Sequence, residues 1–474
     1  MHYLPGEGDS IVLSFAPIGM YAPVTTSAGR PPSPIVIIAA AAIGTFIEWY
    51  DLLLAIILAP VLAQNLFPEN DARFLETLAV VGTSYLIRPL GALLFGRMGD
   101  RQGRRKPFLT SLLLMGGATF CIGLIPSFEA VGWYAPFLLL VCRLLQGLAI
   151  SGEYTGAIIY VAEQAPERRR GFFTGFIQAT VPLGLLLCLL VVYSTRRLLG
   201  NEAFDAYGWR IPFLFSAFLI ALGWFIRTRL PESLLFAQMQ EQGSSSSMPV
   251  KDSFRTRRNR MLLLIAIFGG CAAQSTLMQT THFVTLFYLQ RTVLLPVETV
   301  LIIVGTATII SSPLLQFFGS VSDKLGRKPI IISGLLLSIF FMPLVFHFMH
   351  PIGNPEGLAA VHTVSLTAMV QLTGLLLCLH VSCAMVYGPV GAFILELFPT
   401  QIRYTSMGFA YNVGNGVLGG LTPFITELFV RMIVPISAAF VPFAGLIYPL
   451  TLISIAIFVN AFTAPETYRK SLTT

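Results

Sequence analysis

The most informative segment of the chain is Gly96-Arg-Met-Gly-Asp100-Arg101-Gln-Gly103-Arg104-Arg105-Lys106-Pro107. A degenerate copy follows much later, as Gly319-Ser-Val-Ser-Asp323-Lys324-Leu-Gly326-Arg327-Lys328-Pro329. Each copy joins two apolar stretches, and its glycines permit a tight loop between closely packed helices. A repeat of this kind indicates two homologous halves.

Two further pairs of short segments recur at nearly the same separation. Glu163–Pro166 has the pattern Glu-x-x-Pro, which returns at Glu396–Pro399. Pro231-Glu232-Ser233 is matched by Pro465-Glu466-Thr467. Three matches in the same order make chance an implausible explanation, so we infer an internal duplication.

The composition excludes most soluble classes of protein. Of 474 residues, 55% are hydrophobic and only 11% are charged, against about 25% charged in soluble domains. The net charge of +7 is explained by basic loops on one side of a membrane, so no nucleic-acid partner is expected. None of the six cysteines forms a Cys-x-x-Cys pair, and we expect neither a metal site, a cofactor nor a disulfide framework.

Apolar stretches long enough to cross a bilayer recur along the chain. They cover 35–63, 75–96, 108–126, 133–161, 172–195, 210–226, 261–289, 298–318, 330–349, 364–395, 405–430 and 436–462. Together with the duplication, they predict an all-α membrane protein with twelve transmembrane helices in two pseudo-symmetric six-helix bundles.

The domain boundaries follow from the connections. We expect a loose tail at 1–33, bundles at 34–229 and 261–464, a linker at 230–260 and a short tail at 465–474. Lys and Arg are concentrated in alternate connections, which predicts that both termini, the linker and both tails are cytoplasmic.

The motifs resemble those of the major facilitator superfamily, and several segments resemble its metabolite:proton symporter branch. The segments are 44–51, 88–96, 143–163, 209–213 and 411–423, together with the two loop copies. The resemblance implies a multi-pass protein of the bacterial inner membrane, working as a monomeric unit in the lipid bilayer. It also implies proton-coupled import, by alternating access, of an organic acid or a compatible solute. The branch includes transporters of proline and betaine, 2-oxoglutarate, citrate and shikimate. Thr45 departs from the family pattern, as do Ser320 and Ser322.

Acidic residues within apolar stretches are the candidates for proton coupling. Glu48 and Asp51 are three residues apart and therefore share one helix face. Two neighbouring buried carboxylates repel each other, so one of them is expected to carry the coupled proton. Glu153 is a further candidate. The alternative for Glu48 and Asp51 is a fixed structural ion pair with Arg88 or Arg143, and the alternative for Glu153 is a buried structural bond.

Basic, aromatic and amide side chains at mid-membrane depth are the candidates for substrate binding. Arg143 and Arg88 could each bind a carboxylate with two hydrogen bonds. The other expected contacts are Tyr154, Gln178, Gln279, Tyr387, Tyr411, Asn412 and Asn415. Each of these could instead form an interhelical hydrogen bond. His282 and His380 are interpreted as packed side chains.

A cytoplasmic gate is expected where the loop copies and the helix ends meet. Its expected members are Gly96, Asp100, Arg101, Gly103, Arg104, Arg105, Glu163, Arg170, Asp323, Arg327, Glu396 and Arg403. These charges would hold the two halves together and separate when the gate opens. Alternatively, they only fix the topology.

The sequence therefore predicts a transporter that imports a small solute together with protons. Two alternatives stay open: a proton-independent facilitator or efflux pump on the same fold, and a receptor that no longer transports. No catalytic motif is found in the sequence, and an enzyme is not expected.

Overall fold

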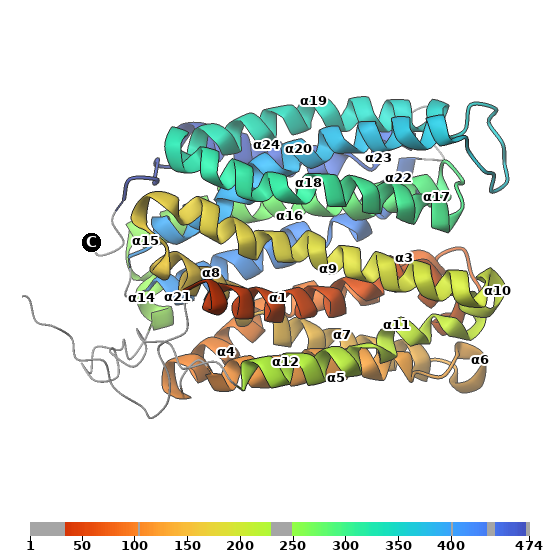
Figure 1. Ribbon diagram of the computed structural model, residues 1–474, viewed down its shortest axis with the longest axis horizontal. Coiled ribbons are helices and arrows are strands. Elements are labelled where there is room, and N and C mark those ends of the chain that lie inside the picture. The colour runs from red at the N-terminus through yellow and green to blue at the C-terminus, as the bar shows by residue number, and fades with distance from the viewer. Residues whose placement is uncertain (1–33, 103–104, 229–248, 400–401, 434–440, 471–474) are drawn as a thin grey trace, which may run out of the picture.

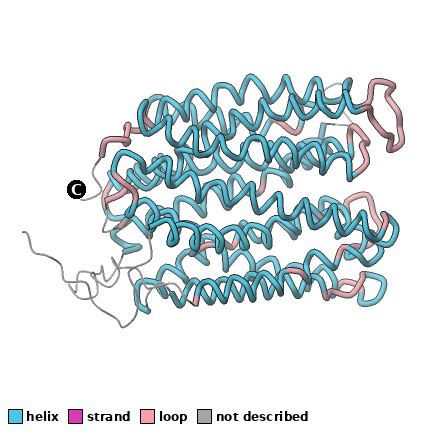
Figure 2. The backbone as a smooth tube through the Cα atoms, in the orientation of Figure 1, coloured by secondary structure: helices cyan, strands magenta, loops and turns pink. Residues whose placement is uncertain are grey.

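The computed structural model describes residues 34–102, 105–228, 249–399, 402–433 and 441–470. Within these ranges the regular elements are helices (Figures 1 and 2). The prediction of an all-α membrane protein is therefore confirmed.

The helices of the first half precede residue 228. They are α1 (Pro34–Ile57), α2 (Ala59–Leu66), α3 (Arg73–Leu86), α4 (Arg88–Gln102), α5 (Arg105–Gly123), α6 (Phe128–Val131), α7 (Tyr134–Ile150), α8 (Glu153–Gln164), the 3₁₀ turn η1 (Glu167–Arg169), α9 (Arg170–Leu199), α10 (Asn201–Ala203), the π-helical η2 (Phe204–Gly208), α11 (Arg210–Leu214) and α12 (Ser216–Arg227).

The helices of the second half follow residue 248. They are α14 (Pro249–Arg255), α15 (Arg257–Leu264), η3 (Ile265–Cys271), α16 (Ala272–Gln279), η4 (Thr280–Val284), α17 (Thr285–Arg291), α18 (Val297–Leu325), α19 (Arg327–Gly353), α20 (Leu366–Leu397), α21 (Arg403–Tyr411), η5 (Asn412–Gly419), α22 (Thr422–Ile433), α23 (Val441–Ala444) and α24 (Ile447–Phe462), of which η3, η4 and η5 are π-helical.

Helix occupies each of the twelve expected apolar stretches. In the described ranges, eight helices are long and apolar enough to cross a membrane, and two bent pairs raise the number to ten. Two shorter apolar helices, Leu109–Gly123 and Ile447–Phe462, occupy the remaining stretches. The first stretch bends by 59° between α1 and α2, where Pro60 lacks the N–H that a continuous helix would use.

Part of the segment expected as a linker is helical. Residues 230–248 lie outside the described ranges, but α14 begins at Pro249 and α15 at Arg257. Thr256 precedes α15 in an extended conformation, and its hydroxyl accepts a hydrogen bond from the Asn259 amide. This N-cap explains why the helix begins before the apolar stretch that was expected to start it.

Long helices run side by side through the molecule. In Figure 1, α18, α19 and α20 lie along one side, α5 and α12 lie along the other, and α1 and α9 lie between them. Near one end, α9 of the first half crosses α18 of the second half at two glycines. A Cβ atom on Gly171 would lie 2.4 Å from the Gly319 carbonyl oxygen, and one on Gly319 would lie 2.4 Å from that of Gly171. Only glycine allows these backbones to approach so closely.

The glycine crossing generates a prediction for stability. Gly319→Ala places a methyl group against backbone that must move, so we expect a loss of about 1–3 kcal/mol in stability. The matched control is Gly374→Ala in α20, where a Cβ atom meets nothing within 4 Å. Thermal unfolding of the purified protein should show a lower Tm for the first variant and an equal or higher Tm for the control. Equal Tm values for the two variants would contradict a tight crossing.

Candidate functional site

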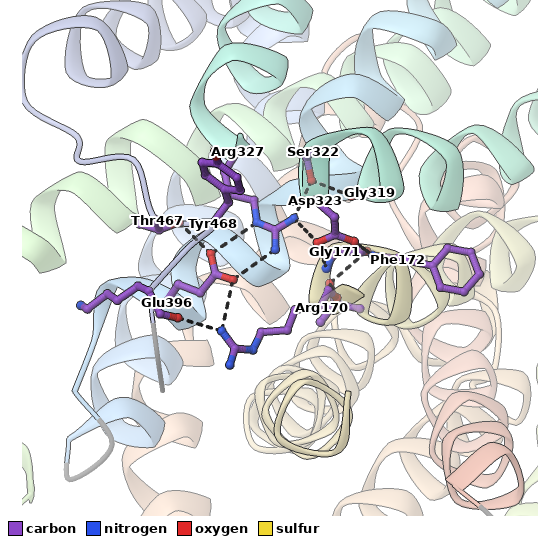
Figure 3. A network of polar contacts seen from close by, with 12 residues as sticks. Arg170, Gly171, Phe172, Gly319, Ser322, Asp323, Arg327, Glu396, Thr467 and Tyr468 are labelled. Carbon is purple, nitrogen blue, oxygen red and sulfur yellow. Dashed lines mark hydrogen bonds and ion pairs between the residues drawn. The ribbon is translucent and has the colours of Figure 1, made fainter. Parts of the chain in front are cut away.

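An ion-pair network closes one end of the bundle, between the two halves (Figure 3). We call this the basic end. The Arg327 guanidinium donates two hydrogen bonds to the Glu396 carboxylate, at 3.3 and 3.1 Å. It also donates to the Asp323 carboxylate at 2.6 Å and to the Ser322 hydroxyl at 2.7 Å. Arg327 and Glu396 are fully buried, so each charge depends on the other for compensation.

Asp323 carries the network across to the first half. Its two carboxylate oxygens accept hydrogen bonds from the backbone amides of Gly171 and Phe172, at 2.8 and 2.9 Å. These amides begin α9, where the helix dipole favours a negative charge. The glycine crossing brings them within reach, so Asp323 of one half binds the helix N-terminus of the other.

Two further groups complete the network. Arg170 approaches Glu396 at 3.9 Å and donates to the Lys470 carbonyl oxygen at 2.9 Å. The Thr467 hydroxyl donates to Glu396 at 2.8 Å. We call the set Arg170, Asp323, Arg327, Glu396 and Thr467 the latch.

The segment that follows α24 is bound to the same end. The Glu466 carboxylate accepts from the amides of Arg327 and Lys328, which begin α19. Partial burial and the neighbouring guanidinium groups of Arg258 and Arg403 lower the pKa of Lys470. Lys470 thus lies among basic side chains, and Glu466 fixes this segment to the start of α19.

The structure brings together four residues expected in the gate: Arg170, Asp323, Arg327 and Glu396 (Figure 3). Arg403 is buried nearby and donates to the Phe398 carbonyl oxygen. Gly103 and Arg104 lie outside the described residues. The side-chain positions of Gly96, Asp100, Arg101, Arg105 and Glu163 are likewise outside the described part, so their roles stay predictions.

Some groups that contact the latch could not be predicted from the sequence. Ser322 stands out there only as a departure from the family motif, and the backbone amides of α9 carry no sequence signal. Thr467 belongs to the repeated Pro-Glu-Thr segment, which could have pointed to it.

The opposite end is also closed by contacts between the halves. The Arg291 guanidinium lies 4.0 Å from the centre of the Phe74 ring and 3.3 Å from the Glu427 carboxylate. Phe74 also packs edge-on against Phe287 at 5.3 Å. These contacts join α3 of the first half to α17 and α22 of the second.

Between the two closed ends, Arg88 is buried, and it has no acidic partner in the described part of the chain. Its guanidinium donates to the Asn415 side chain at 3.2 Å and lies over the rings of Tyr85 and Trp49, at 5.0 and 5.8 Å. Its Nε has no hydrogen-bond partner. Among the described residues, no carboxylate lies within 4.0 Å of it. A buried cation normally has a partner of opposite charge.

Aromatic and amide groups surround this cation. Tyr154 stacks on Tyr411 at 4.5 Å and meets Trp49 edge-on at 5.8 Å. Tyr387 also lies within electrostatic range of Arg88. Several polar atoms here are buried and have no hydrogen-bond partner among the described residues: the Tyr154 and Tyr411 hydroxyls and the Gln274 amide. The Gln178 amide likewise has no partner in the described part of the chain, but it lies beside Gly391 of α20. We call Arg88, Trp49, Tyr154, Gln274, Tyr387, Tyr411 and Asn415 the central cluster.

Two expected substrate contacts instead bridge helices. The Asn412 amide donates to the carbonyl oxygens of Ser151 and Gly408, at 3.0 and 2.8 Å. The Gln279 amide donates to the Gly420 carbonyl oxygen at 3.1 Å. Their NH₂ groups are therefore engaged by the protein.

Arg143 differs from Arg88 in having several protein partners. It donates to the carbonyl oxygens of Val81 and Leu52, at 3.0 and 3.1 Å. It also donates to the side chains of Gln146 and Ser84, at 2.6 and 2.7 Å. All four acceptors are neutral groups of the first half, so Arg143 connects helices within that bundle.

Asp51 lies inside the first bundle. Its side chain is fully buried, and neither carboxylate oxygen has a hydrogen-bond partner among the described residues. Its neighbours include Cys188 of α9 and Thr119 of α5. Glu48 is buried one turn earlier on α1. The Glu153 side chain lies outside the described part.

Comparisons with known proteins agree with this geometry. The sequence profile of the Major Facilitator Superfamily matches residues 39–423. The ectoine/proline transporter ProP of Corynebacterium glutamicum is 31% identical over 82% of this chain and 77% of its own length. The shikimate transporter of Escherichia coli is 32% identical over 81% of this chain and 86% of its own length.

A solved structure has the same fold. The xylose transporter XylE from Escherichia coli, in a partially occluded inward-open conformation, aligns with a TM-score of 0.67. The alignment covers 93% of this chain and 99% of that one, at 19% identity. The twelve helical stretches, the duplicated loop and these matches establish an integral membrane protein, and the chain belongs to the major facilitator superfamily.

Proposed function

We propose that this protein is a secondary transporter that imports a small organic solute bearing a carboxylate, in symport with protons and by alternating access. It lies in the bacterial inner membrane, with its basic end and both termini in the cytoplasm. The observation that carries the proposal is the buried Arg88 guanidinium, which lies between the halves and has no acidic partner among the described residues. A carboxylate on the cargo would supply the missing charge and two hydrogen bonds.

The closed ends support alternating access. Contacts at the latch and around Phe74 and Arg291 isolate the central cluster from both sides. A cargo can reach Arg88 only after one set of contacts has separated. The glycine crossing and the hydrogen bonds from α9 to Asp323 link the two bundles at the basic end, so this is where we expect the cytoplasmic gate to open.

Asp51 supports the proton-coupled part of the proposal. An ionised carboxylate without a partner is costly in a protein interior, and binding a proton removes that cost. Because Asp51 lies within the first bundle, the proton would bind inside that bundle. Glu48 and Glu153 remain candidates for proton coupling.

The two buried arginines should respond differently to substitution. We expect Arg88→Gln to weaken binding of the transported carboxylate by about 30-fold or more, because a buried charge pair is lost. Its Tm should stay equal or rise, since an uncompensated buried charge disappears. Arg143→Gln should lower the Tm by several degrees, because it leaves buried acceptors unpaired.

Thermal unfolding and binding of L-proline, ectoine and shikimate to the purified protein test this contrast. Arg197→Gln is a control at an exposed guanidinium. A stable Arg88→Gln variant with normal affinity would disprove the assignment of Arg88 to the cargo.

Asp51→Asn should separate cargo movement from the proton gradient. The amide cannot release a proton, so we expect accumulation driven by an imposed pH gradient to fall about tenfold or more. Exchange of labelled for unlabelled cargo at equal pH should persist. Both accumulation and exchange can be measured in proteoliposomes. The control is Asp205→Asn, which alters a partly exposed ion pair with Arg196. Unchanged proton-driven accumulation would remove Asp51 from the coupling mechanism.

Asp323→Asn should weaken closure of the basic end. The amide side chain retains one acceptor oxygen and loses the charge that pairs with Arg327 and with the α9 dipole. We expect the closed conformation to be destabilised by about 1–3 kcal/mol relative to the open one. Spin labels at Arg168 and Leu325, in a cysteine-free background, report the distance across the latch, with Glu356→Gln in an exposed loop as the control. An unaltered distance distribution would show that Asp323 does not hold the end closed.

A further inference from the structure

A small pocket that contains two histidines lies beside the central cluster. It is lined by residues of α9, α16, η4, α18 and α20, and therefore by both halves. The lining residues are Pro182, Met278, His282, Ser311, Ser312, Leu315, His380, Cys383, Ala384 and Tyr387. Tyr387 also belongs to the central cluster, so one phenol ring connects the two regions. We call this the histidine pocket.

The two histidines are neighbours although 98 residues of sequence separate their positions, 282 and 380. Their ring centroids are 4.7 Å apart, with the planes at 70°. Each Nδ1 lies 2.9 Å from a backbone carbonyl oxygen of its own helix, that of Met278 or that of Leu376. A carbonyl oxygen only accepts, so each Nδ1 carries the hydrogen and each Nε2 of the neutral ring is an acceptor.

The Nε2 atoms are poorly provided with donors. The His282 Nε2 atom is buried and has no hydrogen-bond partner among the described residues. The His380 Nε2 atom lies 3.5 Å from the Thr308 hydroxyl, which also lies 2.8 Å from the Val304 carbonyl oxygen. The hydroxyl has a single hydrogen, and the shorter contact with Val304 takes it.

The serines of the pocket add further acceptors. The hydroxyls of Ser311 and Ser312 both donate to the Thr308 carbonyl oxygen, at 3.2 and 2.7 Å. Their lone pairs are left for other partners. Among the described lining residues, Tyr387 is the one strong side-chain donor, and the Cys383 thiol is a weak one. The histidine pocket therefore offers more acceptors than donors.

From this imbalance we propose that the histidine pocket binds a hydrogen-bond donor of the cargo, a hydroxyl or an N–H group, through His282 Nε2. The proposal rests on the proposed function and deepens it, because the cargo carboxylate would lie at Arg88. The cargo is then a carboxylic acid that also carries a hydrogen-bond donor. A second carboxylate or a quaternary ammonium group offers no hydrogen to the pocket.

This chemistry divides the solutes of the resembled branch into two sets. Proline, ectoine and shikimate each combine a carboxylate with N–H or O–H donors. Glycine betaine and 2-oxoglutarate lack such donors at neutral pH. A site built around buried acceptors rejects ligands without donors, because their binding would leave those acceptors unpaired.

Binding to the purified full-length protein in nanodiscs tests the proposal. The sharpest comparison is L-proline against N,N-dimethyl-L-proline, which keeps the ring and the carboxylate and loses both N–H groups. Shikimate and ectoine are further donor-bearing ligands, and glycine betaine and 2-oxoglutarate are further donor-free ligands. We expect at least one donor-bearing acid to bind about tenfold or more tightly than every donor-free acid.

Variants of the pocket assign the preference to its residues. His282→Phe keeps an aromatic ring and removes the acceptor, so it should abolish the preference. His282→Asn retains an acceptor oxygen and should keep part of it. His347→Phe is the matched control, because His347 is exposed and stacks on Phe443 outside the pocket. If His282→Phe does not fold, the His282→Asn variant and the wild-type ligand series still give the answer.

Several outcomes would overturn the inference. They are donor-free acids binding as tightly as donor-bearing ones, no binding of any donor-bearing acid, and a preference that survives in His282→Phe. Proton-driven accumulation of glycine betaine or 2-oxoglutarate would overturn it and leave the proposed transport intact. Selective binding of a donor-bearing acid without any flux in proteoliposomes would support the histidine-pocket inference and contradict the proposed transport.

Discussion

The rest of the structure depends on the cost of burying a charge without a partner. In the membrane interior a charge or polar group must find its partner within the protein. The latch meets this requirement internally: Arg327 is shared between Glu396, Asp323 and Ser322. Arg143 meets it with neutral acceptors. Arg88 does not meet it, since its contacts are an amide oxygen and aromatic faces. Among the described residues, Arg88 therefore has no partner of negative charge, and a carboxylate cargo would supply one.

At the basic end, a close approach of two backbones provides the buried charge of Asp323 with its partners. The hydrogen bonds from Gly171 and Phe172 to Asp323 require the start of α9 to reach α18 directly. The glycines at the crossing allow this, because they have no side chain that would hold the two backbones apart. An interaction between a carboxylate and a helix N-terminus is worth only about 1–3 kcal/mol. Such an energy is suited to a gate that must open in every cycle.

Much of the fold could be predicted from the sequence, because span length and internal repeats are local signals. They placed all twelve helical stretches and brought Arg170, Asp323, Arg327 and Glu396 to one site. Hydropathy could not reveal the bend at Pro60 or the helix at Pro249, since neither changes the apolar content. Partnerships across helices were also hidden. Arg143 and Arg88 look alike in the sequence, and only packing separates a satisfied guanidinium from an unsatisfied one. His282 and His380 each looked like a single packed side chain, and their pairing depends on how α20 packs against η4.

Helix α1 offers a physical link between the proton and cargo sites proposed here. Trp49 faces the interface between the two halves, where it contacts Arg88 and Tyr154. Asp51, two residues later, lies in the first bundle beside Thr119 and Cys188. Between them, the Tyr50 hydroxyl donates to the Pro212 carbonyl oxygen at 2.7 Å and ties α1 to α11. Because consecutive side chains of one helix point in different directions, a small rotation or shift of α1 changes both environments at once. Coupling then needs no direct contact between proton and cargo, only a helix whose position depends on the charge state of Asp51 and on the partner of Arg88.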